Sequence, residues 1–104
     1  MLVRAKERDG ALVVMLDGEL DHHAAEYTRS EMDRLMAETR AGQIILDLAS
    51  LKFMDSTGIG VLIGRYKKMQ ERNVPIFIQN CNNQPDRIFQ MSGLYTILPK
   101  KDAR

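Results

Sequence analysis

The feature that constrains the fold most is the alternation of strand-like and helix-like segments along the chain. Short apolar runs typical of strands span residues 2–7, 11–16, 43–48, 74–79 and 94–98. Segments with helical spacing separate them, at residues 21–39, about 57–72 and 86–92. Strands that alternate with helices predict parallel pairing through right-handed crossovers. We therefore predict an α/β domain in the order ββαβαβαβ, with a mixed, mostly parallel β-sheet packed with α-helices.

Local signals indicate where these elements begin and end. Asp9 followed by Gly10 is typical of a two-residue hairpin, which makes the first strand an antiparallel edge. Gly18 is expected to break the second strand. Asp21 is expected to cap the first helix, and Gly42 to end it.

The later elements carry similar signals. Pro75 indicates a strand start or a sheet edge. Pro85 is expected at the first position of the last helix, and Gly93 at its end. Arg65, with Lys68 and Arg72, is predicted to form a solvated face of the second helix.

Composition excludes several classes of protein. The chain has 104 residues, 44% apolar and 28% charged, with a formal charge of +1, which fits one ordinary domain. No dominant basic stripe indicates nucleic-acid or anionic-membrane binding, and no apolar run is long enough to span a membrane. The single cysteine, Cys81, excludes an internal disulfide and is expected to be a buried thiol. We predict a cytoplasmic protein, because one free cysteine fits a reducing compartment.

The stretch from Leu51 to Gly60 carries most of the chemistry. Asp55, Ser56 and Thr57 lie where a strand-like run passes into a helix-like one. A phosphate there would meet free backbone N–H groups and the positive end of a helix dipole. All three residue types also cap helices well, so Ser56 could instead be a plain N-cap.

Two glycines follow this stretch on one helical face. Gly60 and Gly64 are four residues apart, and each costs about 1 kcal/mol relative to alanine inside a helix. We therefore expect close packing there, by either the sheet or a partner.

Catalytic motifs are missing from the sequence. A hydrolase elbow needs glycine two residues before the serine, where this chain has Met54. The only histidines, His22 and His23, are adjacent and would face about 100° apart on a helix, which disfavours metal chelation. No glycine-rich phosphate loop is present. We predict no enzyme activity, no metal and no cofactor.

Several separated motifs resemble the anti-sigma factor antagonists, which are single STAS domains. They are Gly18-Glu19-Leu20-Asp21-His22-His23-Ala24-Ala25-Glu26, Phe53-Met54-Asp55-Ser56-Thr57-Gly58-Ile59-Gly60-Val61, Gly64-Arg65-Tyr66-Lys67 and Met91-Ser92-Gly93-Leu94. The similarity runs from about residue 12 to residue 98 and is greatest to the sporulation anti-sigma F factor antagonists of endospore-forming bacteria. It implies one STAS domain over residues 1–104, without the final amphipathic helix that members usually have.

The resemblance also implies a switch. An unphosphorylated antagonist binds an anti-sigma factor that is also a serine kinase, and so releases the sigma factor. The kinase then uses ATP to phosphorylate the antagonist, and a separate serine phosphatase restores it. By motif, the phosphorylated residue is Ser56, with Thr57 as a minor rival where members often have a second serine. The implied partner-binding residues are Asp21, Asp55, Ser56, Thr57, Gly58 and Gly60.

An alternative remains open at this point. The chain could be a constitutive STAS interaction or scaffold module, in which Ser56 only begins a helix.

Overall fold

The computed structural model describes residues 1–101, so residues 102–104 of the expected domain lie outside it. Its elements are β1 (Leu2–Arg8), β2 (Ala11–Leu20), α1 (Ala25–Glu38), β3 (Gln43–Asp47), β4 (Leu51–Met54), α2 (Ser56–Glu71), β5 (Ile76–Gln79) and α3 (Asn83–Ser92). A 3-10 turn at Leu94–Thr96 follows α3.

The five strands form one mixed sheet, as predicted. The strand order is β1-β2-β3-β5, and β4 pairs with the far end of β2. Only β1 is antiparallel to its neighbour. The predicted hairpin between β1 and β2 is confirmed, because Asp9 and Gly10 both have positive φ, 53° and 80°, as a type I′ turn requires.

The order of elements differs from the prediction in two places. The segment 94–98, predicted as a strand, forms a 3-10 turn, and only a single bridge from Lys100 to Ile78 continues the sheet. Strand β4 was not in the predicted order. It exists because Gly18 does not break β2: the register shifts between Gly18 and Glu19, and β2 then pairs with β4.

Three predicted helix boundaries are also wrong. Helix α1 begins at Ala25, after an N-cap residue with no side-chain cap, while Asp21 caps the turn before it. Gly42 does not end α1, because Thr39 is the C-cap and already has an extended backbone. Pro85 is the third residue of α3 instead of the first. Gly93 ends α3 as predicted, with a left-handed φ of 75°.

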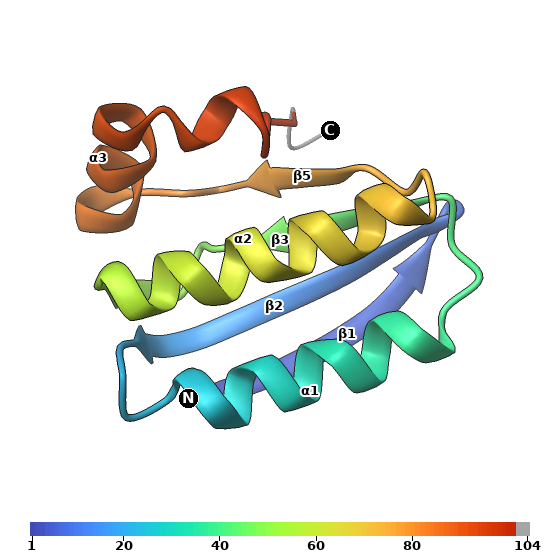
Figure 1. The fold of residues 1–104 in the computed structure, drawn as a ribbon, viewed down its shortest axis with the longest axis horizontal. Helices are drawn as coiled ribbons and strands as arrows, with labels where there is room; N and C mark the ends of the chain where they lie inside the picture. The colour runs from blue at the N-terminus through green and yellow to red at the C-terminus, as the bar shows by residue number, and fades with distance from the viewer. Residues whose placement is uncertain (102–104) are drawn as a thin grey trace.

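Helices α1 and α2 run side by side over one face of the sheet (Figure 1). The main core lies between these helices and the sheet, and includes Leu12, Val14, Ile44, Leu46 and Ile78. A smaller cluster of Ala11, Val13 and Ile45 lies on the opposite face, and it contains strand residues only. The sheet residues alternate between these two faces, as strand geometry requires.

The expected solvated face of α2 is wrong for Arg65. Its side chain is only 5% exposed, because it points into the contact between α2 and α1. Its Nε lies 2.9 Å from Asp33 Oδ1, although the N–H is not aligned on that oxygen as a hydrogen bond would be. The exposed Lys68 joins the same carboxylate at 3.1 Å. Asp33 therefore ties the two helices together.

Candidate functional site

The candidate site is built where β2 and β4 end. These strands are parallel, and Leu20 is registered with Met54, so their carboxyl ends meet at one edge of the sheet. Asp21 follows β2 and Asp55 follows β4. The Asp55 N–H donates to the Leu20 carbonyl at 3.3 Å, which holds the two loops together. This pairing brings the loop that begins at Asp21 next to the segment that leads into Ser56.

Asp55 is the N-cap of α2. One carboxylate oxygen accepts a hydrogen bond from the Gly58 N–H at 2.9 Å, as capping residues do. The other oxygen accepts one from the His22 N–H at 3.2 Å. Asp55 therefore joins the start of α2 to the loop after β2. The interpretation of Ser56 as the N-cap is wrong, because Ser56 is the first residue of the helix.

Asp21 organises the neighbouring loop. Its Oδ1 accepts hydrogen bonds from the N–H groups of His23 and Ala24, both at 3.0 Å. The bond from Ala24, with a further contribution from His23, lowers the pKa of Asp21 below its ordinary value. Asp21 is thus a carboxylate near neutral pH, and it lies in the loop that Asp55 joins to the start of α2.

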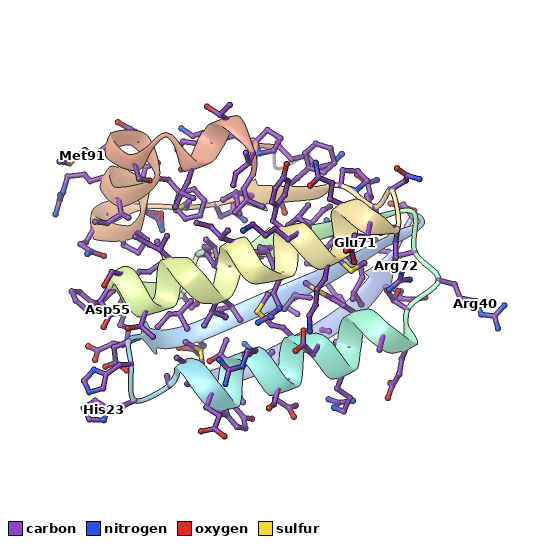
Figure 2. All side chains as sticks on the ribbon, in the orientation of Figure 1. His23, Arg40, Asp55, Glu71, Arg72 and Met91 are labelled. Carbon is purple, nitrogen blue, oxygen red and sulfur yellow. The ribbon has the colours of Figure 1, made fainter. Side chains whose placement is uncertain are left out.

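Ser56 presents its hydroxyl to solvent. Ser56 and Thr57 are both exposed, and within residues 1–101 neither hydroxyl makes a hydrogen bond. They open a 16-residue helix, so their N–H groups have no partner within the helix, and the helix dipole favours negative charge there. Figure 2 shows Asp55 at this end of α2, on the same side of the molecule as His23. The arrangement leaves Ser56 accessible to another protein.

Gly58 is the glycine that the fold requires at this site. A Cβ on Gly58 would lie 2.2 Å from the Leu20 carbonyl oxygen, so only glycine lets α2 approach β2 this closely. Close packing was expected at Gly60 and Gly64 from either the sheet or a partner, and the sheet alternative is wrong, because a Cβ on either glycine would have nothing within 4 Å. Gly60 is exposed and lies four residues after Ser56 on the same face of α2. A partner could therefore reach the backbone there.

Sequence reasoning missed a clamp from α3. Gln84 accepts a hydrogen bond from the Met54 N–H at 3.0 Å and donates one to the Met54 carbonyl at 2.8 Å. It thereby fixes the last residue of β4, next to Asp55. Phe53 and Met91 were also missed: they are 40% and 84% exposed, and Met91 projects at the same end of the molecule as Asp55 (Figure 2). Gln84 and Met54 are 30 positions apart in the sequence, so only the structure reveals the contact between them.

Other chemistry has little support in the part of the chain that the structure describes. No three His, Cys, Asp or Glu side chains of residues 1–101 gather as a metal site. Cys81 is partly buried, and burial raises the pKa of its thiol, which disfavours a reactive thiolate. No helix among these residues is both long and apolar enough to cross a bilayer.

The sequence is similar to those of known proteins. The family model of the STAS domain matches residues 3–103. The chain belongs to the STAS domain family. It is 37% identical over 100 residues to the anti-sigma F factor antagonist of Paenibacillus polymyxa, a match that covers 96% of this chain and 86% of that protein.

Two solved structures of one antagonist are also similar to the chain. The unphosphorylated form of SpoIIAA matches with a TM-score of 0.80 at 29% identity, over 99% of this chain and 89% of that one. The phosphorylated form, from Bacillus, matches with a TM-score of 0.72 at 29% identity, over 99% and 92%. A relative of this chain thus retains the fold in both states.

Proposed function

We propose that this STAS domain is an anti-sigma factor antagonist that is switched by phosphorylation of Ser56. In the unphosphorylated form it binds an anti-sigma factor that is also a serine kinase, and so releases a sporulation sigma factor in the cytoplasm. The kinase supplies ATP and the catalytic groups, and a serine phosphatase reverses the modification. The domain itself is a substrate and a binding surface, with no catalytic residue, metal or cofactor.

The observation that carries the proposal is the exposed Ser56 hydroxyl at the start of α2. It is the first residue of a helix whose cap, Asp55, is already occupied by two N–H groups. The serine is therefore not needed to cap the helix and is available for modification. The proposed binding surface surrounds it and comprises Asp21, Asp55, Ser56, Thr57, Gly58 and Gly60.

A phosphate on Ser56 would act mainly at the interface with the partner. It adds roughly −1.5 to −2 charges, and a helix N-terminus offsets only about 0.3–1 kcal/mol of their cost. The carboxylate of the neighbouring Asp55, and that of Asp21 in the loop bound to Asp55, oppose even that gain. A thousandfold loss of affinity requires about 4 kcal/mol, which an unpaired dianion buried in an interface can supply. The fold should change little, in keeping with the similarity of both SpoIIAA forms.

A pull-down with the anti-sigma kinase tests the proposal. The wild type should bind with ADP and be released with ATP, with one phosphate located on Ser56 by mass spectrometry. Ser56→Ala should bind in both nucleotides, because it has no acceptor hydroxyl. Thr57→Ala is the matched control and should behave as the wild type.

Two results would contradict the proposal. Phosphate on Thr57 would move the switch to the neighbouring residue. Stable binding in ATP without any phosphate would instead favour the constitutive interaction module.

A further inference from the structure

The face of the sheet opposite α1 and α2, here called the back face, is the side that carries Ala11, Val13 and Ile45. These three residues form a cluster of their own, with Met15 packed against them. Each is at most 4% exposed although no helix residue joins the cluster. The flanking side chains therefore provide most of their cover.

Three cations line one side of this apolar cluster. Arg4, Lys6 and Arg8 on β1 stand opposite Met15, Val13 and Ala11 in the register, so they project from the back face. All three are exposed, and none forms an ion pair with another residue of 1–101. They make a positive edge without close ion pairs, and Asp17 and Asp47 lie on the same face near the Arg4 end of it.

A fourth cation lies on the other side of the apolar cluster. Lys101 sits over the Phe77 ring, with Nζ 4.9 Å from the ring centre, and donates to Gln43 Oε1 at 3.2 Å. Between Lys101 and Arg8 the surface forms a hollow of about 430 Å³ with Ala11 and Ile45 in its lining. Asp9, in the first turn, is the one acidic residue that lines it. At this end, the back face thus has an apolar floor between the positive side chains of Arg8 and Lys101.

The spacing of the positive edge fits an α-helix. Alternate residues of a strand are about 6.6–6.8 Å apart, and residues four apart in a helix are about 6.0 Å apart. Acidic side chains at every fourth position of a helix would therefore meet Arg4, Lys6 and Arg8 in turn. Apolar side chains beside them would cover the partly exposed Met15 and Phe77. We propose that the back face binds an acidic amphipathic helix of a protein partner.

Other occupants fit less well. A second copy is disfavoured because a two-fold axis across the strands stacks the β1 cations on one another, and an axis along the strands places Arg8 over Lys101. Single-stranded nucleic acid needs aromatic platforms, and Lys101 already covers Phe77. An anionic membrane needs several exposed apolar side chains that can insert, whereas the floor of the back face is buried and the exposed Leu2 on β1 is a single side chain.

This surface is separate from the Ser56 loop. The hollow lies at the start of β2 and β3, near Ala11 and Gln43, while Ser56 follows the carboxyl end of β4. Parallel strands place these at opposite ends of the sheet. Both surfaces could be occupied at once, so the inference stands or falls independently of the proposed phosphorylation switch.

An NMR titration of the full chain tests the inference. The probe is an 18-residue helical peptide with glutamate at every fourth position beside a stripe of leucines. Its addition should shift amide resonances of β1, β2 and β3 and leave those of Ser56 and Thr57 unchanged. Lys6→Glu should weaken binding at least tenfold. Arg40→Glu makes the same charge change at a side chain that projects into solvent (Figure 2), and it should alter affinity less than twofold.

Circular dichroism checks that each variant is folded, and Lys6→Gln provides a milder change that should weaken binding about threefold. A peptide with lysines in place of the glutamates should not bind. The inference is overturned if both peptides bind equally, or if the shifts centre on the start of α2. It is also overturned if a dT12 oligonucleotide or phosphatidylserine vesicles bind the back face more tightly than the acidic peptide. Dimerisation through this face in sedimentation experiments would overturn it as well.

Discussion

Replacing Gly58 with alanine should separate α2 from the end of β2. The new Cβ would lie 2.2 Å from the Leu20 carbonyl oxygen, 2.9 Å from Leu20 Cγ and 3.0 Å from Met54 Cγ. Ordinary van der Waals contact begins near 3.4 Å, so the first turn of α2 must move by about 1.2 Å. The nearest atom belongs to the backbone of a buried strand and cannot rotate away.

The cost follows from what this movement breaks. The hydrogen bonds from Asp55 N–H to Leu20 and from His22 N–H to Asp55 cross the same gap, at 3.3 Å and 3.2 Å. Each is worth about 1 kcal/mol, and overpacking adds about 1–3 kcal/mol. Alanine recovers about 1 kcal/mol of helix propensity. We expect a net loss of about 2–4 kcal/mol in the free energy of unfolding, or roughly 10–20 °C in Tm.

The matched control is Gly60→Ala, two residues later in the same helix. Nothing lies within 4 Å of its Cβ, so it should gain about 0.4–1 kcal/mol. Urea unfolding followed by circular dichroism measures both variants. Equal midpoints for the two would refute the argument that the Leu20 carbonyl requires glycine at position 58. If partner binding is measured too, a stable Gly60→Ala that binds weakly would place the partner on this face of α2.

Three further substitutions test other parts of the structure. Asp55→Asn keeps an oxygen for the Gly58 N–H but cannot also accept from His22, so it should lose about 1 kcal/mol in the free energy of unfolding. Asp21→Asn keeps both its acceptor bonds and should lose less, and equal losses in urea unfolding would contradict this. Arg65→Met removes buried Nε and Nη1 donors that lack hydrogen-bond partners, so its free energy of unfolding should be within about 1 kcal/mol of the wild type. Arg65→Ala should lose about 2 kcal/mol or more, because it leaves a cavity. A large loss in both variants would show that the charge itself stabilises the helix pair. Burial, together with the hydrogen bond to Asp86, raises the pKa of Tyr95 above its ordinary 10.0. The unfolded chain therefore loses this proton first, and the free energy of unfolding should fall as pH rises above 10. Tyr95→Phe should flatten that pH dependence in unfolding curves measured between pH 9 and 11.

Much of the fold can be predicted from local sequence patterns. The alternation of strands and helices predicted the sheet, and Asp9 with Gly10 predicted the hairpin because few other pairs tolerate two positive φ angles. Gly93 ended its helix for the same conformational reason. The position of Ser56 at a strand-to-helix junction was also recognisable from the chain alone. These features depend on residues that are neighbours in sequence.

Other features depend on what lies across space. Asp55, Ser56 and Thr57 are all adequate caps, and Asp55 caps α2 because its second oxygen also reaches His22 on another loop. Arg65 has the polarity of a surface residue, yet it is buried because Asp33 on α1 faces it. Gly58 and Gly60 are indistinguishable by propensity, and only the approach of the Leu20 carbonyl makes one of them necessary. Long-range contacts choose among options that are locally equivalent, so the tertiary structure alone decided which residue caps α2, which glycine is required and that Arg65 is buried.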